Sequence, residues 1–191
     1  MVYKILLLAL LTSCASGPRD KVLVRSDDLD ERPVWAKVAE TAFIKEGRLF
    51  VVGLSETDVD AKIPAVARIA DNNARFEISR IITDDLSFIF QNMEEGVTDN
   101  AELTRFYASE ISKHVSHGIR QEKRYWEKVE SFDSEGEKKL KLRFYSLASI
   151  KESDLKKAIK ESLDSGNKLD PRLKEQVNNH LFREIEKLGQ N

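Results

Sequence analysis

Residues 139–147 read KLKLRFYSL, and this stretch decides the class of fold. Apolar side chains at positions 140, 142 and 144 alternate with charged or amphipathic ones. A period of two residues is typical of a β-strand with one buried and one exposed face. The run Tyr125–Phe132 precedes it across the turn-forming sequence DSEG at 133–136, so we expect the two runs to pair as an antiparallel hairpin.

Another hairpin is predicted earlier in the chain. The apolar runs Ala42–Ile44 and Leu49–Val52 flank the sequence KEGR at 45–48. Gly47 can adopt the positive φ that a tight turn needs, because it has no Cβ. The sheet is therefore expected to contain two hairpins.

Two helices are predicted between these hairpins. From Pro64 to Phe90, apolar residues recur every three or four positions, which indicates a helix with one buried face. These residues are Val66, Ala70, Ala74, Ile78, Ile82, Leu86 and Ile89. Asp99 and Glu102 have the spacing of a capping box and open the next helix, which Gly118 ends. Its apolar stripe is Leu103, Tyr107, Ile111 and Val115.

Two more helices are predicted after the later hairpin. Ser153 is expected to cap a helix that stops near Gly166, and Asp170 with Pro171 to begin the last one. The last helix has an apolar stripe formed by Leu173, Val177, Leu181, Ile185 and Leu188. This stripe either completes the core or docks a protein partner or a second copy of the chain, and the sequence leaves both open.

The predicted order of elements is ββααββαα, which indicates an α+β fold. Helices would pack on one face of an antiparallel sheet made from the two hairpins. The chain has 191 residues, of which 41% are apolar, enough for the core of one domain. With 31 basic and 33 acidic residues, the net charge of −2 provides no general attraction to nucleic acid, and no nucleic acid partner is expected.

The first residues have the layout of a secretory signal peptide. A positive charge precedes the apolar run Ile5–Leu11, which is far shorter than the ~20 residues of a membrane-spanning helix. Residues 11–14 read LTSC and resemble the lipobox of bacterial lipoproteins. The resemblance implies that Cys14 is lipidated on sulfur and that the chain is cut between Ser13 and Cys14.

Two other hypotheses for Cys14 are weaker. It is the only cysteine, so it cannot form a disulfide within the chain. It could be a buried, unreactive thiol, or a catalytic nucleophile with a partner base and a supporting fold. Polar, turn-prone residues at 15–18 follow directly, and the order of charge, apolar run and small residues favours lipidation.

Lipidation would tie the chain to a membrane. Ala15, rather than an aspartate, follows the cysteine and resembles the outer-membrane sorting pattern of enteric bacteria. We therefore expect an outer-membrane anchor with the protein facing the periplasm, while the inner membrane and the cell surface stay open as alternatives. The polar residues up to Arg32 would form a tether, in which the acidic cluster at 27–31 is a solvated charge run.

No catalytic or metal-binding motif stands out. His114 and His117 would share one helix face, but a zinc site needs three or four protein ligands, and the remaining histidine, His180, is in the last helix. The sequence has no G-x-S-x-G, phosphate-binding glycine loop or H-E-x-x-H motif. It therefore predicts neither an enzyme nor a bound cofactor or metal.

Two further groups of residues have a structural interpretation. The adjacent acids at 84–85 and 94–95 would diverge on a helix, so solvated surface explains them best. Trp35, Trp126, Tyr125 and Tyr145 could form an aromatic platform for a glycan or peptide. Aromatic residues on short strands more often fill the core, which is the favoured interpretation.

The chain resembles the LPP-twenty family of small bacterial outer-membrane lipoproteins, whose domain also occurs in flagellar basal-body lipoproteins. The resemblance rests on the lipobox, PVW at 33–35, LFVVGLS at 49–55, ADNNARFEI at 70–78 and FYSL at 144–147. It covers about Pro33 to Leu163, and the last helix extends past the usual end of the domain. The family has no established catalytic residues, which implies a non-enzymatic role.

Together these features predict four segments: a signal peptide (1–13), a lipidated cysteine with a polar tether (14–32), an LPP-twenty-like α+β domain (33–166) and a C-terminal helical extension (167–191). The predicted function is an envelope lipoprotein that presents a periplasmic protein-interaction domain, in flagellar or other envelope assembly or in self-association. The alternative is a periplasmic binding module for a peptide, glycan or lipid. An exposed apolar stripe on the last helix would favour the first, and a pocket lined by Trp35 or Trp126 the second.

Overall fold

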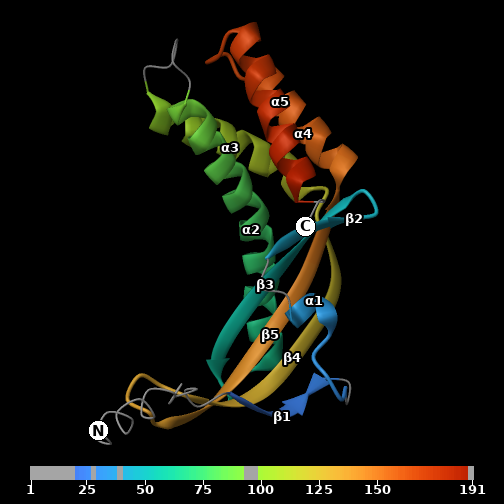
Figure 1. The fold of residues 1–191 in the computed structure, drawn as a ribbon, viewed down its shortest axis with the longest axis vertical. Helices are drawn as coiled ribbons and strands as arrows, with labels where there is room; N and C mark the ends of the chain where they lie inside the picture. The colour runs from blue at the N-terminus through green and yellow to red at the C-terminus, as the bar shows by residue number, and fades with distance from the viewer. Residues whose placement is uncertain (1–19, 27–28, 38–40, 93–98, 189–191) are drawn as a thin grey trace, which may run out of the picture.

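The computed structural model describes residues 20–26, 29–37, 41–92 and 99–188. The elements in chain order are β1 (Lys21–Arg25), α1 (Val34–Lys37), β2 (Ala42–Lys45), β3 (Arg48–Asp58), α2 (Ile63–Gln91), α3 (Asn100–Ser116), β4 (Arg120–Phe132), β5 (Lys138–Lys151), α4 (Glu152–Ser165) and α5 (Pro171–Lys187). The molecule is elongated, with a sheet at one end and a group of helices at the other (Figure 1).

The sheet has five antiparallel strands in the order β1-β4-β5-β3-β2, which confirms the α+β class. The predicted order ββααββαα is wrong, because β1 precedes β2 and, apart from the short α1, the order is βββααββαα. The sheet is also not built from two hairpins alone, since β1 pairs with β4, from Lys21 opposite Glu130 to Arg25 opposite Glu127. The sequence did not indicate β1 because the strand is short, and a distant part of the chain supplies its partner.

Two glycines at turns have the backbone conformation that their sequences suggested. Gly47 has φ of 68° and Glu46 of 52°, the pair of positive values that a two-residue turn between β2 and β3 needs. Gly136 has φ of 82° in the turn between β4 and β5. The carboxylate of Asp133 stabilises this second turn by accepting hydrogen bonds from the N–H groups of Glu135 (3.0 Å) and Glu137 (2.9 Å).

The long helices join the sheet through one face, as predicted, and only the four-residue helix α1, which was not predicted, packs on the opposite face. The first half of α2 packs against Leu142 and Phe144 of β5, and Trp126 borders this cluster. The opposite face carries Tyr125 and Tyr145, which pack with Ala36 of α1. This division follows from the alternation of side chains along each strand.

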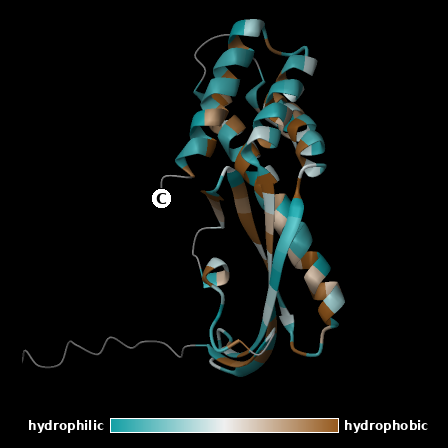
Figure 2. Cartoon of the chain, turned by 90° about the vertical axis from the view of Figure 1, so that its right-hand side faces the viewer, coloured by the Kyte–Doolittle hydropathy of each residue, from teal (hydrophilic) through white to brown (hydrophobic). Residues whose placement is uncertain are grey.

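The second half of α2 leaves the sheet and joins α3, α4 and α5, and we call this group of helices the head (Figure 1). α2 begins at Ile63 and ends at Gln91, within one residue of the range expected from its periodicity. The main core joins the head to the upper sheet, through Ile78, Leu86, Tyr107, Ile111, Ile159, Leu163, Val177 and Leu181 on the helices and Leu49, Val51 and Ile150 on the strands. Hydrophilic residues cover much of the outside of the head (Figure 2).

Two of the three predicted helix caps are present. The side chain of Asp99 accepts a hydrogen bond from the N–H of Glu102 (2.8 Å), and that of Asp170 accepts one from Leu173 (2.9 Å). Ser153 does not cap α4, because β5 ends at Lys151 and α4 begins at the next residue. Lys151 occupies the cap position, and its side chain makes no capping hydrogen bond.

The predicted tether extends too far into the fold. β1 lies within it, and Arg32 binds the carboxylate of Glu127, whose side chain is completely buried. The hydroxyl of Tyr125 donates a hydrogen bond to the same carboxylate (2.9 Å). Residues 20–26 and 29–32 are therefore part of the folded body. At the other end of the chain, α5 is part of the main core rather than an extension.

Candidate functional site

A groove lies between α2 and α5 in the head. Its volume is about 570 Å³, and its lining is Phe88, Ile89, Asn92, Gln176, Asn179, His180 and Arg183. We call it the α2/α5 groove. The groove forms because the apolar face of α5 is buried in the core. A polar face of the same helix then lies beside the end of α2.

Phe88 is the largest apolar side chain at this groove that solvent can reach. It is 57% exposed, whereas its neighbours Ile89 and Phe90 are buried in the core. The ring of His180 on α5 lies 5.7 Å from the ring of Phe88, centroid to centroid. Covering an exposed aromatic ring releases a few kcal/mol of hydrophobic free energy, so Phe88 is a ready contact for another molecule.

Two carboxylates lie close to the groove on the facing helices. Burial and the nearby carboxylate of Glu184 raise the pKa of Asp85 to about 6. Glu184 is 2.6 Å from Lys187 and 3.5 Å from Nε2 of His180. This Nε2 atom is buried and has no hydrogen-bond partner among the described residues. The groove itself thus presents an exposed ring, side-chain amides and the guanidinium of Arg183, and the two partly buried carboxylates lie outside its lining.

The sequence does not single out Asp85, since it predicts solvated surface for both acids at 84–85. That interpretation holds for Asp84, which is exposed and pairs with Arg80 at 2.8 Å. It is wrong for Asp85, which is half-buried against α5. No sequence signal could reveal this, because the burial depends on a helix almost a hundred residues later. The acids at 94–95 lie outside the described residues.

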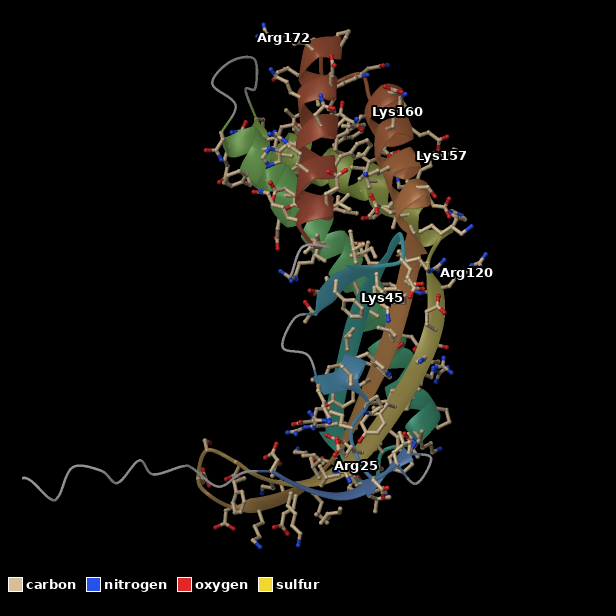
Figure 3. All side chains as sticks on the ribbon, turned by 45° about the vertical axis from the view of Figure 1, so that its right-hand side comes forward. Arg25, Lys45, Arg120, Lys157, Lys160 and Arg172 are labelled. Atoms are coloured by element: carbon tan, nitrogen blue, oxygen red, sulfur yellow. The ribbon has the colours of Figure 1, made fainter. Side chains whose placement is uncertain are left out.

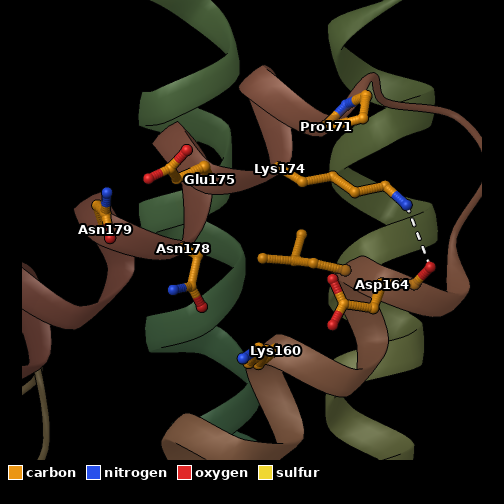
Figure 4. A pocket seen from close by; sticks show the side chains of 8 residues that line it. Lys160, Asp164, Pro171, Lys174, Glu175, Asn178 and Asn179 are labelled. Carbon is orange, nitrogen blue, oxygen red and sulfur yellow. Dashed lines mark hydrogen bonds between the residues drawn. The ribbon is translucent and has the colours of Figure 1, made fainter.

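A smaller groove borders the other flank of α5, between α4 and α5 (Figure 4). Its volume is about 440 Å³, and its lining includes Leu163 together with Lys160, Asp164, Lys174 and Asn178. Lys174 donates a hydrogen bond to the backbone carbonyl of Asp164 (3.1 Å). Asn179 lines both grooves, so α5 is a ridge that separates them.

The apolar stripe of α5 lies inside the chain's own core. Val177, Leu181 and Ile185 are almost completely buried, and Leu173 and Leu188 pack against the same cluster. Of the two roles that the sequence left open, the stripe completes the core. It is not an exposed surface for a partner in this structure.

The histidines do not converge. Nδ1 of His114 lies 2.9 Å from Oγ of Ser162, a fully buried hydroxyl that donates to the carbonyl of Ala158. His117 bonds to the carbonyl of Lys113 at 2.9 Å, and His180 lies in the α2/α5 groove. Across residues 20–26, 29–37, 41–92 and 99–188, no group of three or more His, Cys, Asp or Glu side chains could hold a metal ion.

The four aromatic residues do not form one platform. Tyr125 and Tyr145 are buried on the α1 face of the sheet with Trp35 beside them, whereas Trp126 lies on the α2 face. Neither tryptophan lines either of the two grooves in the head. Ser13 and Cys14 lie outside the described residues.

The comparisons with known protein families and with curated proteins found no match. Among the helices of the described residues, none is both long and apolar enough to span a membrane. The resemblance to the LPP-twenty family stays a prediction from the residues quoted above.

Proposed function

We propose that this protein is a non-enzymatic envelope lipoprotein, anchored through Cys14, that binds a protein partner at the α2/α5 groove. One observation carries the proposal: the groove and the point where the chain enters the fold lie at opposite ends of the molecule (Figure 1). Cys14 precedes Asp20 by six residues, a length of at most about 20 Å. A lipid on Cys14 would keep the sheet near the membrane and hold the head away from it.

The groove also indicates the chemistry of the partner. Phe88 offers an apolar contact, and Arg183 adds a positive charge to the lining, whereas Asp85 and Glu184 lie outside the lining and Glu184 pairs with Lys187. A partner segment with an apolar side chain next to an aspartate or glutamate complements the ring and the arginine. The resemblance to the LPP-twenty family adds a flagellar or other envelope assembly as the proposed setting.

The anchor is tested by metabolic labelling with a fatty acid. The wild-type chain should incorporate the label, and the Cys14→Ser chain should not, because its serine has no thiol to carry the diacylglyceryl group. Equal labelling of the two chains would remove the lipoprotein part of the proposal.

The docking site is tested by photocross-linking in the intact envelope. A photoreactive residue at position 88 should capture one reproducible protein. The same residue at position 76 is the control, because Phe76 is also on α2 and is 71% exposed but lies away from the groove. Capture of the same protein from both positions would argue against a site at the groove.

Binding of the captured protein in purified form then measures the contribution of the groove. Phe88→Ala should weaken binding about tenfold, as expected for an aromatic side chain at the centre of an interface. Phe76→Ala should leave the affinity unchanged. If both variants bind like the wild type, the partner contacts another surface.

A further inference from the structure

His180 is a titratable side chain in the lining of the α2/α5 groove. Its ring lies 5.7 Å from the ring of Phe88, centroid to centroid, and its side chain is 23% exposed. Its Nε2 atom is buried, has no hydrogen-bond partner among the described residues and lies 3.5 Å from the carboxylate of Glu184. Histidine ordinarily changes its charge between about pH 5 and pH 8, so the charge of this lining can depend on pH.

Arg183 is the only residue of the described lining with a permanent positive charge. It follows His180 by three residues on α5, and residues at that spacing lie on the same face of a helix. The basic residues labelled on the head in Figure 3, Lys157, Lys160 and Arg172, belong to α4 and to the first turn of α5 and do not line the groove. A proton on His180 would therefore place a second positive charge beside the guanidinium of Arg183.

The charged groups around His180 and Asp85 come from both helices. On α5 they are Glu184 and Lys187, whose opposite charges lie 2.6 Å apart, and on α2 the nearest other carboxylate is that of Asp84. Asp85 has a pKa of about 6, because burial and the carboxylate of Glu184 disfavour its charged form. As the pH falls through this range, Asp85 loses negative charge and histidine gains positive charge, so both changes make the surroundings of the groove more positive.

Charges that stay constant do not alter the direction of this change. Arginine and lysine remain charged from about pH 5.5 to pH 7.5. The acids at 94–95 lie outside the described residues, and a glutamate of ordinary pKa stays ionised over the same range. Such charges set the absolute affinity of the groove, whereas the difference in affinity between two pH values reports the groups that titrate.

We propose that protonation of His180 regulates the α2/α5 groove, so that the groove binds a carboxylate of its partner more tightly at about pH 5.5 than at pH 7.5. The inference rests on the proposed function and adds the regulation of its site. A carboxylate that approaches Arg183 meets one positive charge when the ring is neutral and two when the ring is protonated. At a partly exposed site, the added attraction should change the affinity about fivefold.

The test uses two fluorescent probes that share an aromatic framework. Anilinonaphthalene sulfonate carries a sulfonate that stays ionised at both pH values, and phenylnaphthylamine is its uncharged counterpart. The full chain with Cys14→Ser is titrated with each probe at about pH 5.5 and pH 7.5. The sulfonate probe should bind about fivefold more tightly at the lower pH, because the protonated ring attracts its anion. The uncharged probe should bind equally at both, and it also reports any loosening of the fold, which would increase the binding of both probes.

Three variants assign the effect to the groove. His180→Gln keeps a polar side chain that cannot be protonated, so the affinity for the sulfonate probe should lose most of its pH dependence. Asp85→Asn removes the neighbouring negative charge and should raise the affinity at pH 7.5 toward its value at the lower pH. Phe88→Ala should weaken the sulfonate probe at both pH values, because the exposed ring is its apolar contact.

Two control variants make the same changes elsewhere. His117→Gln and Asp60→Asn replace exposed side chains that do not line the groove, and both should behave like the wild type. The apolar run at 5–11 contains no titratable side chain and is present in every sample. An increase in affinity for the sulfonate probe at low pH that persists in His180→Gln, or that is lost equally in His117→Gln, would overturn the inference.

Proton NMR of the histidine rings follows the charge directly. The ring of His180 should change its protonation between about pH 5.5 and pH 7.5, and the saturating sulfonate probe should increase the protonated fraction, because binding and protonation are linked. A ring that keeps one charge state over this range would overturn the inference.

The protein captured at position 88 separates this inference from the proposed function. A partner that binds through Phe88 with the same affinity at both pH values would overturn the regulation and leave the docking site intact. Failure to capture any protein would count against the docking site, whereas the probe and NMR measurements would still decide whether the groove responds to pH.

Discussion

Gly53 sets the distance between β3 and α2. A Cβ atom at this position would overlap the carbonyl oxygen of Ala70 and the backbone nitrogen of Ala74. These are backbone atoms of a long helix, so they cannot move aside as a side chain can. We expect Gly53→Ala to lower the free energy of unfolding by about 3 kcal/mol, at the upper end of overpacking effects, as measured by chemical denaturation.

Gly118→Ala is the matched control for this prediction. Its added Cβ would meet the side chain of Ile150 at 3.1 Å, and a side chain can shift by a few tenths of an ångström. A smaller loss of stability is expected. Similar losses in the two variants would mean that the close approach of α2 to β3 is not what requires glycine at position 53.

Asp85 should make the stability of the protein depend on pH. Its pKa is about 6 in the folded chain against 3.8 for an ordinary aspartate, so the folded state disfavours the charged carboxylate. Well below pH 3.8 the carboxyl is protonated in both states and has no effect, and the penalty grows as the pH rises from 3.8 to about 6. Asp85→Asn should therefore stabilise the chain above pH 6 and much less at pH 4.

The stabilisation should be about 1 kcal/mol at pH 7.5, less than the full pKa shift would give, because water screens a half-buried side chain. Thermal unfolding of both chains at pH 4 and pH 7.5 measures it. Asp84→Asn, at the exposed neighbouring position, should change stability by less than about 0.5 kcal/mol at either pH. A stabilisation by Asp85→Asn that is equal at both values would exclude the carboxylate charge as its cause.

The sequence does not predict the roles of Gly53, Asp85 and Glu127. Their roles come from pairs that the fold brings together: Gly53 with α2, Asp85 with Glu184, and Glu127 with a residue 95 positions earlier. Periodicity reports which face of an element is buried, but not which polar residue on that face finds a partner.

At the scale of elements, the two caps of the later helices behave differently. The carboxylate of Asp170 binds the N–H of Leu173, whereas Ser153 caps nothing because β5 runs directly into α4. Asp170→Ala should cost about 1 kcal/mol of stability, a typical value for losing an N-cap. Ser153→Ala should cost less than about 0.5 kcal/mol, and equal losses in denaturant melts would contradict this assignment.

The elements with strong local signals were predicted well. α2, α3 and α5 each carry an apolar stripe of helical period, and their ranges agree closely with those expected. β1 and α1 were not predicted, since five and four residues are too few for a period to emerge. What holds them in place is the buried carboxylate of Glu127 and the edge of β4, neither of which is local.

At the scale of the whole molecule, the proposed anchor fixes an orientation. The turn between β4 and β5 lies at the lower end with β1, and the first turn of α5 lies at the top of the head (Figure 1). Because Cys14 is the only cysteine and lipidation would use its thiol, a fluorophore can be attached to one introduced cysteine. In the lipidated chain, quenchers on lipid headgroups should quench a label at Glu135→Cys more strongly than one at Arg172→Cys.

The reverse order would mean that the head faces the membrane, and it would contradict the orientation even if Cys14 is lipidated. Equal quenching would mean that the long axis lies parallel to the surface. A chain with Cys14→Ser, measured in the same way, gives the background from vesicle binding without a lipid anchor.

The head and the sheet share two connections that have no loop in them. α2 runs unbroken for 29 residues, about 43 Å, with its first half on the sheet and its second half in the head. β5 continues directly into α4, and it pairs on both sides along nearly its full length. A tensile force applied to the head would therefore be transmitted to the sheet along α2 and β5. It would load the strand hydrogen bonds together in shear, the direction in which a sheet resists rupture most strongly.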